Sequence, residues 1–205
     1  PKRNSWSICN LEHAEETRHA WERFLQNPGP IVIGAAQGAA CFGAAYEFLF
    51  NLRYQLKKHH LLDKAPLTYV TAEPFLGHFG IGGLGNAKSL SETFFGMQGI
   101  TWRTDATVQE VRPESVVLGS GEVLPSRFTM IIPRFLGIDA IRNTPGLGNA
   151  NGFIETDDGY RHKQYPEVYA AGVAVHVPPV GETAVPCGVP KTGYPSEVMA
   201  KTAAA

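Results

Sequence analysis

The sequence lacks long apolar runs and concentrated charge of one sign, and each absence excludes a class of protein. No stretch reaches the roughly 18 to 20 continuous apolar residues that a membrane-spanning helix needs. Residues 1–5 (PKRNS) also lack the apolar segment of a signal peptide. The formal net charge is −1 and no long basic run occurs, which argues against nucleic-acid binding. We therefore expect the chain as given to be soluble and to bind no nucleic acid.

Cysteine is also scarce, with three residues in 205. Cys9, Cys41 and Cys187 form neither a CxxC metal motif nor the dense framework of a disulfide-stabilised domain. We therefore expect no metal site, and a reactive rather than structural role for any cysteine that functions. Cys187 lies between Pro186 and Gly188 without a helix start of its own, and we interpret it as a bystander.

The chain has enough apolar residues to build a core. It is 43% hydrophobic and 18% charged, which suits one large domain or two modest ones. It begins without methionine and stops inside a helical pattern, so we expect it to be part of a longer protein.

Helix and strand patterns alternate in the first half of the chain. Apolar periodicity predicts a βαβ unit with parallel strands. This unit and the helix before it are expected at 11–25, 30–34, 38–58 and 67–72. After the glycine-rich residues 73–86 we expect a helix at 88–97, a meander of short strands at 100–102, 107–111, 115–118 and 122–124, and a strand at 128–132. The predicted fold class is α/β, a Rossmann-like (NAD-like) three-layer domain that carries an antiparallel β meander.

Proline and glycine become dense between residues 143 and 152, where we place a domain crossing. Beyond it, residues 153–157 and 168–172 predict two further strands. Residues 190–194 are expected to open a final helix.

The glycine pattern after the first strand departs from a dinucleotide-binding motif. Counted from Gly34, the motif needs glycine at positions 36 and 39, and alanine stands at both. A β-carbon there would crowd a pyrophosphate, so we interpret this as a Rossmann turn that has lost NAD(P) binding. A literal GxGxxG occurs at 80–85, but it lies well past the strand tip and is interpreted as a flexible loop. Glu73 follows Gly34 by 39 residues, where about 20 is expected for a ribose-binding carboxylate.

Two cysteines fall at predicted helix starts. Cys9 precedes a helix with Asn10 as its N-cap, and Cys41 falls in the first turn of the next helix. Because a helix N-terminus stabilises a thiolate, we predict lowered thiol pKa values, the alternative being that both are small buried apolar residues. His13 follows Cys9 by one helical turn and could shuttle protons. His78 is next to Gly77, which lets the backbone approach a ligand closely.

Four motifs in order resemble sulfide:quinone oxidoreductase, a family of flavoproteins with the disulfide-reductase superfold. The motifs cover nearly the whole chain, so the resemblance is more specific than any single glycine pattern. They are residues 7–14 (SICNLEHA), 28–35 (PGPIVIGA) with 41–43 (CFG), 73–78 (EPFLGH) and 189–194 (VPKTGY).

This resemblance implies that FAD is held by a Rossmann domain interrupted by a second, NAD-like domain, and that cysteines oxidise sulfide while electrons leave to a quinone. Cys9 and Cys41 match two of the family's three redox cysteines. His13 and His78 match histidines associated with its proton handling. Cys187 does not match the third redox cysteine, which the resemblance places beyond residue 205.

The resemblance also assigns flavin contacts to the end of the chain. Gly172 and Val173 match one contact segment, with valine where the superfamily commonly has aspartate. Lys191, Thr192 and Gly193 match the next segment, where a helix N-terminus and a lysine favour negative charge on a reduced flavin.

The resemblance implies a central fragment with three parts: residues 1–27 as a connecting segment of the FAD domain, 28–150 as the NAD-like domain, and 151–205 as the returning part of the FAD-binding domain. The family's amino-terminal GxGxxG would precede residue 1. We therefore expect the chain alone to hold FAD weakly or not at all and to show no turnover. The whole protein is expected to bind the prokaryotic cell membrane peripherally, and it could form a homo-oligomer, although the sequence does not settle the oligomeric state.

Three alternatives stay open. The chain could come from a sulfide dehydrogenase that passes electrons to a cytochrome, or from a type II NADH dehydrogenase, although the altered glycine turn argues against NADH. It could also be a non-catalytic Rossmann-like domain that binds a partner and buries its cysteines as core residues.

Overall fold

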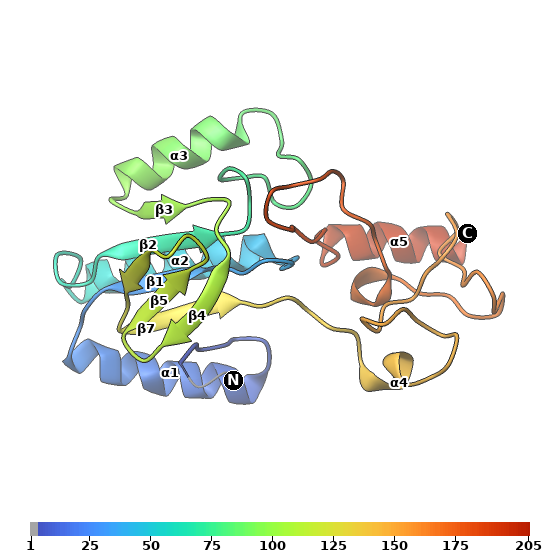
Figure 1. Ribbon diagram of the computed structural model, residues 1–205, viewed down its shortest axis with the longest axis horizontal. Coiled ribbons are helices and arrows are strands. Elements are labelled where there is room, and N and C mark those ends of the chain that lie inside the picture. Colours follow the sequence, from blue (N-terminus) through green and yellow to red (C-terminus); the bar gives the residue numbers. More distant parts are fainter. Residues whose placement is uncertain (1–3) are drawn as a thin grey trace.

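A four-stranded parallel sheet forms the centre of the molecule (Figure 1). The computed structural model describes residues 4–205. The sheet order is β3-β2-β1-β7. The strands are β1 (Ile31–Ala35), β2 (Leu67–Thr71), β3 (Thr101–Arg103) and β7 (Phe128–Ile132). Every residue of β1 is buried, because β1 is a central strand covered on both faces. This explains the unbroken apolar run in its sequence.

The sheet is covered by helices on one face and by a small antiparallel sheet on the other. The helices are α1 (Leu11–Gln26), α2 (Phe42–Lys58) and α3 (Ala87–Met97), and the meander strands are β4 (Val108–Arg112), β5 (Ser115–Leu118) and β6 (Val123–Pro125). Because side chains alternate along a strand, Ile31 and Ile33 join the core under the helices, whereas Val32 joins the core under the meander. The predicted α/β class, Rossmann-like with an antiparallel meander, is confirmed.

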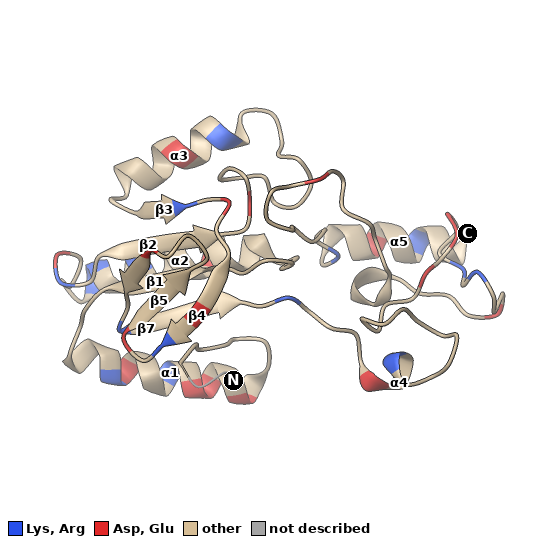
Figure 2. Cartoon of the chain, viewed as in Figure 1, with Lys and Arg blue, Asp and Glu red and all other residues tan. Residues whose placement is uncertain are grey.

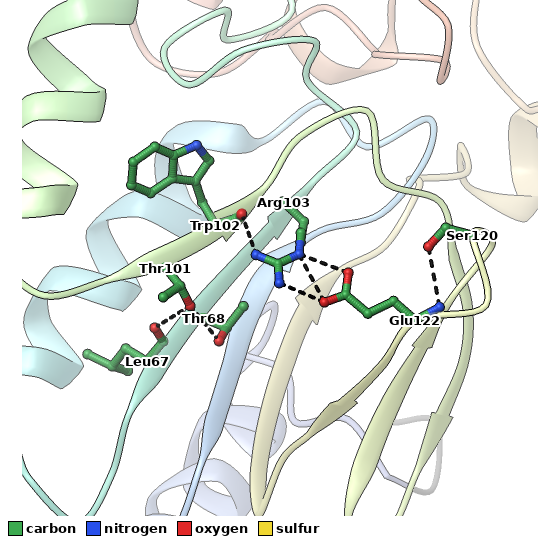
Figure 3. A network of polar contacts seen from close by, with 7 residues as sticks. All are labelled: Leu67, Thr68, Thr101, Trp102, Arg103, Ser120 and Glu122. Carbon is green, nitrogen blue, oxygen red and sulfur yellow. Dashed lines mark hydrogen bonds and ion pairs between the residues drawn. The ribbon is translucent and has the colours of Figure 1, made fainter.

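A polar network ties the meander to the edge of the parallel sheet (Figure 3). The Arg103 guanidinium at the end of β3 donates three hydrogen bonds to the Glu122 carboxylate, at 3.1, 2.8 and 2.6 Å. The hydroxyls of Thr68 and Thr101 lie 2.9 Å apart and join β2 to β3. The edge strand is therefore held from both sides.

The C-terminal region, residues 133–205, lies at the other end of the long axis, in yellow to red in Figure 1. It contains α4 (Asp139–Arg142), the 3-10 turn η1 (Gly172–Ala174) and α5 (Tyr194–Ala204). Its core is small and consists of Ile154, Ala170, Val175 and Met199. Acidic and basic residues are interspersed along both regions (Figure 2). Within residues 4–205, no helix combines the length and apolar character needed to cross a membrane.

Several predicted elements differ from the structure. Residues 153–157 and 168–172 are not strands: they pair only at isolated bridges, such as Ile154 with Val175, because proline, glycine and aspartate interrupt the segment. The strand predicted at 100–102 to belong to the meander is instead β3, which pairs parallel to β2 after the α3 crossover. The last helix starts at Tyr194 rather than at residue 190, since Gly193 has a positive φ of 57° and does not continue a right-handed helix.

Candidate redox site

The first segment with predicted site residues ends at the start of α1. The Asn10 side chain caps this helix by accepting a hydrogen bond from the His13 backbone N–H, at 2.8 Å, as predicted. Cys9 precedes this cap and is exposed. The Ser7 hydroxyl accepts a hydrogen bond from the Cys9 backbone N–H at 3.3 Å and lies 3.2 Å from His13 Nδ1. Ser7 thus links the thiol segment to the imidazole, and sequence reasoning did not single it out, although its hydroxyl two residues before Cys9 was a usable signal.

Cys9 and Cys41 line the same pocket, of about 170 Å³. Cys41 is the N-cap residue of α2, one position before the predicted first turn, and it is half-buried. The remaining wall is mostly apolar and comes from residues 7–8, Ala44 of α2, and residues 130–133 and 135 at the end of β7 and beyond. Segments separated by 32 residues therefore bring two thiols to one apolar pocket.

The predicted lowering of the Cys41 thiol pKa is wrong. Burial raises the pKa of this thiol, the nearby Cys9 raises it further, and a hydrogen bond with the Thr192 side chain acts in the opposite direction. Desolvation of the thiolate is the largest of these effects. The contact also places Thr192, from the far end of the chain, beside Cys41.

His78 lies in the loop after β2, apart from the two cysteines. The residues that line the cysteine pocket, taken from 4–205, do not include it. Its Nδ1 accepts a hydrogen bond from the Gly80 backbone N–H at 3.2 Å, and its ring stands edge-on to Phe75 at a centroid distance of 5.2 Å. Burial lowers the pKa of His78, and the nearby Asp105 acts in the opposite direction.

A second pocket, of about 290 Å³, lies between the turn after β1 and the C-terminal region. Val173 and Lys191 line it together with Phe135 and Phe153, and Arg134 adds a second cation. The Lys191 ammonium donates a hydrogen bond to the Val175 carbonyl oxygen at 2.5 Å and lies 4.0 Å from the centre of the Phe153 ring. Burial lowers the pKa of Lys191.

Gly172 and Gly193 have backbone conformations that favour glycine. Gly172 has φ of 66°, and a β-carbon there would lie 2.7 Å from the Ser196 hydroxyl oxygen. Its backbone N–H donates to the sulfur of Met199 at 3.2 Å. These contacts place η1 against α5, so that Val173 and Lys191 reach the same pocket.

The crevice at the carboxyl ends of β1 and β2 is filled by residues 185–189 of the chain itself. The Gly38 backbone N–H donates to the Pro186 carbonyl oxygen at 2.6 Å, and the Gly188 N–H donates to the Ala39 carbonyl oxygen at 2.8 Å. The Cys187 thiol is buried and donates to the Ala72 carbonyl oxygen at 3.3 Å. Figure 1 shows the dark red segment before α5 reaching back towards the sheet. In a Rossmann fold this crevice receives the dinucleotide.

Gly34 and Glu73, which were compared above with the dinucleotide-binding motif, have structural roles in this protein. A methyl group at Gly34 would overlap the Val70 carbonyl oxygen, so this glycine allows close packing of neighbouring strands. Glu73 is fully buried and its carboxylate accepts hydrogen bonds from within the protein. The GxGxxG at 80–85 lies in the loop between β2 and α3, outside a strand-turn-helix context. Among residues 4–205, no group of three or more His, Cys, Asp or Glu side chains is arranged to hold a metal ion.

Comparison with known proteins identifies similar chains. A curated sulfide-quinone reductase of Aquifex aeolicus (strain VF5) is 39% identical over 207 residues, which cover 98% of this chain and 48% of the reductase. The X-ray structure of the sulfide:quinone oxidoreductase from Aquifex aeolicus superposes with a TM-score of 0.92 at 40% identity, over 97% of this chain and 48% of that one. The resemblance to sulfide:quinone oxidoreductase is confirmed. The chain spans about half the length of these relatives.

More distant structures share the fold. Reduced CoADR-RHD of Bacillus anthracis gives a TM-score of 0.62 at 14% identity, over 98% of this chain and 33% of that one. An NAD-dependent persulfide reductase of A. fulgidus gives 0.61 at 15% identity, over 98% and 34%. No protein-family model matches the chain.

The residues predicted from the sulfide:quinone oxidoreductase resemblance fall into groups. Cys9 and Cys41 share one pocket, and Val173 and Lys191 share the other. Thr192 connects the two groups by its contact with Cys41. His13 contacts Ser7 of the first group. Among the described residues that line the two pockets, His78, Gly172 and Gly193 do not occur.

Proposed function

We propose that this chain is part of a flavoprotein that oxidises sulfide to sulfur or polysulfide and passes the electrons through FAD to a quinone. The observation that carries the proposal is the convergence of Cys9 and Cys41 on one apolar pocket, with Thr192 beside Cys41. It is supported by 39% identity to a sulfide-quinone reductase across 98% of the chain. The activity is proposed for the complete protein, since the chain spans about half of that relative.

The second pocket suits part of an FAD molecule. Phe135 and Phe153 provide aromatic walls, and Lys191 and Arg134 provide cations that favour an electron-rich ring system. Its volume of about 290 Å³ is small for a whole dinucleotide, so we assign residues 151–205 as the returning part of an FAD-binding domain and expect the remaining contacts from elsewhere in the protein. FAD, when bound, would accept the two electrons that sulfur oxidation releases.

Cys41 is assigned as the residue that bonds to sulfur. Its thiolate and hydrosulfide form a persulfide, and the new sulfur–sulfur bond releases one proton and two electrons. The apolar wall of the pocket excludes water, which would otherwise compete for the sulfur species. Cys9, in the same pocket, is placed to receive the sulfur atom by exchange.

His13 is assigned as the acceptor of the released proton. Its Nδ1 lies 3.2 Å from the hydroxyl of Ser7, which itself lines the cysteine pocket. A proton can therefore pass from the pocket to the imidazole through one hydroxyl group. His78, in a separate loop, is assigned to proton handling on a different side of the site.

The crevice contacts argue against the NADH dehydrogenase alternative. The Gly38 N–H, which would face a pyrophosphate, is bonded to the Pro186 carbonyl oxygen, and Glu73 is committed to partners inside the protein. We therefore propose that residues 28–150 form a Rossmann-like domain that does not bind NAD(H). Quinone reduction implies that the complete protein works at the face of a membrane.

The decisive experiment mixes the complete protein with sulfide and follows the flavin absorbance, first alone and then with a quinone. We expect bleaching by sulfide and recovery with quinone. Absence of bleaching would refute the proposed function, and recovery with a cytochrome but not with quinone would favour the sulfide dehydrogenase alternative.

Replacing Cys41 by serine tests the assigned nucleophile in the complete protein. We expect sulfide-driven bleaching to be lost while flavin content and circular dichroism stay unchanged, because serine keeps the shape of the side chain but is a much weaker nucleophile. Ser89→Ala, at an exposed position of α3 that lines neither pocket, is the control and should retain bleaching. Retained bleaching in Cys41→Ser contradicts the assignment. The 205-residue chain alone is expected to show no turnover and weak FAD binding.

A further inference from the structure

The loop that carries His78 has an unusual backbone. Gly77, Phe79 and Gly80 all have positive φ, at 83°, 54° and 73°. This conformation is rare for a residue with a side chain, and for Phe79 it is strained. The surrounding structure must therefore hold the loop in place.

A buried carboxylate and a buried phenol hold it. One Glu73 carboxylate oxygen accepts a hydrogen bond from the Phe79 backbone N–H at 2.8 Å. The other accepts from the Tyr46 hydroxyl at 3.0 Å and from the Thr71 hydroxyl at 2.8 Å. The Tyr46 oxygen in turn accepts from the Gly77 backbone N–H at 2.9 Å. Backbone donors on both sides of His78 thus end on one Glu73–Tyr46 pair.

The pair lies in a region that water does not reach. Glu73 is 0% exposed and Tyr46 is 7% exposed. Tyr46 also packs against the ring of Phe79, at a centroid distance of 5.2 Å. Buried hydrogen bonds to a carboxylate are costly to break, because the partners left behind stay desolvated.

The loop conformation fixes the imidazole of His78. With Gly80 donating its N–H to Nδ1, the neutral ring carries its proton on Nε2. We propose that Glu73 and Tyr46 are positioning residues that hold the His78 loop and thereby set the orientation and tautomer of this histidine for proton transfer. The carboxylate that would bind a ribose in a dinucleotide fold is here used to hold a loop. The proposal rests on the proposed function only for the role of His78 in proton transfer.

The first test measures the loop directly in the complete protein, by hydrogen exchange resolved to the segment 75–83. Tyr46→Phe removes one hydroxyl and keeps the ring, so we expect at least about tenfold faster exchange in this segment. Tyr54→Phe, on the same helix but 58% exposed, is the control and should change nothing. Unchanged exchange in Tyr46→Phe overturns the proposal whatever the enzyme's activity is.

The second test uses Glu73→Gln and Glu73→Leu. Glutamine keeps an oxygen for the Phe79 N–H and an amide that can donate to both hydroxyls, so exchange should stay near that of the unchanged protein. Leucine leaves the Phe79 N–H without a partner, so exchange should rise. Equal exchange in the two variants contradicts the assignment.

The third test measures proton-coupled turnover with sulfide and quinone for Tyr46→Phe, His78→Asn and the double variant. If Tyr46 acts through His78, the double variant should be no slower than His78→Asn alone, whereas Tyr46→Phe alone should slow turnover by about tenfold. Additive losses refute action through His78. Absence of any sulfide-driven turnover refutes the proposed function and leaves the exchange tests to decide the positioning role.

Discussion

The sheet body, residues 4–132, and the C-terminal region, residues 133–205, are held together in different ways. The body has a continuous core in which β1 is buried along its whole length. The C-terminal region has a four-residue core and isolated bridges. It is attached to the body by hydrogen bonds of residues 185–189, which lie in the crevice over β1 and β2.

This difference has a consequence for the candidate site. Cys9 and Cys41 belong to the sheet body, whereas Val173, Lys191 and Thr192 come from the C-terminal region. Their juxtaposition depends on the crevice contacts. Residues 185–189 thus lie where a dinucleotide lies in a Rossmann fold. Their contacts hold the two halves of the proposed redox site together.

The largest effect is expected from Gly34→Ala in the body. The added methyl group would overlap the Val70 carbonyl oxygen of the neighbouring strand, so β1 and β2 cannot keep their spacing. We expect loss of cooperative folding, measured by circular dichroism and thermal unfolding. Gly43→Ala is the control, because among the described residues no atom comes within 4 Å of a methyl group built there. Since Gly43 is the second residue of α2 and not an interior one, the change should alter the free energy of unfolding by less than about 1 kcal/mol. A folded Gly34→Ala protein contradicts the packing argument.

The second prediction compares truncations in the two cores. Phe128 is 1% exposed and contacts the rings of Trp21 and Phe24, so Phe128→Ala should lower the free energy of unfolding by about 3–5 kcal/mol. Met199→Ala removes a large member of the small core and should cost about 2–3 kcal/mol. Its effect should be confined to faster hydrogen exchange in residues 133–205, because we expect the two regions, with their separate cores, to open separately. Equal exchange changes in both regions after Met199→Ala would mean that they form one cooperative unit.

The same difference explains what the sequence could predict. In the body, apolar periodicity and the run 31–33 predicted the helices and central strands, because regular burial leaves a regular pattern. In the C-terminal region the apolar residues at 153–154 and 168–171 looked like strands, yet each pairs at a single bridge. The pairing is decided by contacts across the fold, which leave no local pattern.

For the candidate site, motif resemblance in the sequence named the cysteines and Lys191 as candidates, but it did not predict their environment. The contact of Cys187 with Ala72 and that of Glu73 with Tyr46 join residues 115 and 27 positions apart, so no local pattern encodes them. The prediction of a lowered pKa for Cys41 was wrong for the same reason. The helix start was visible in the sequence, whereas the burial of the thiol was not.

The third prediction uses thiol reactivity to test whether residues 185–189 attach the C-terminal region to the sheet body. Burial raises the pKa of Cys187 to about 11, so at pH 8 roughly one thiol in a thousand is ionised. Alkylation followed by mass spectrometry should modify exposed Cys9 first, Cys41 more slowly and Cys187 last. Because both buried thiols have raised pKa values, their rates should keep rising above pH 9, where an ordinary thiol levels off. A Cys41 rate with its midpoint near pH 8.5, the ordinary pKa of a thiol, contradicts this account.

Two glycine-to-alanine substitutions test the crevice contacts more directly. A methyl group at Gly188 would lie 2.8 Å from the Ala40 β-carbon, which should push residues 185–189 out of the crevice and speed Cys187 alkylation by about tenfold or more. Gly181→Ala is the control in the same region, since no described atom lies within 4 Å of its added methyl group. If Cys187 in Gly188→Ala stays as protected as in Gly181→Ala, the crevice contacts are not what fastens the two regions.

The smallest effect is expected at the edge of the body, where Arg103 and Glu122 join the sheet to the meander (Figure 3). Their side chains are 42% and 37% exposed, so water and salt screen the pair in spite of its bidentate geometry. Arg103→Ala should lower the free energy of unfolding by only about 0.2–1 kcal/mol, and less at 1 M salt. The Arg103 hydrogen bonds lower the pKa of Glu122, so its contribution is present above the ordinary pKa of glutamate and is lost as the pH falls through the lowered value. A loss as large as that of Phe128→Ala would show that the meander depends on this contact rather than on its apolar core.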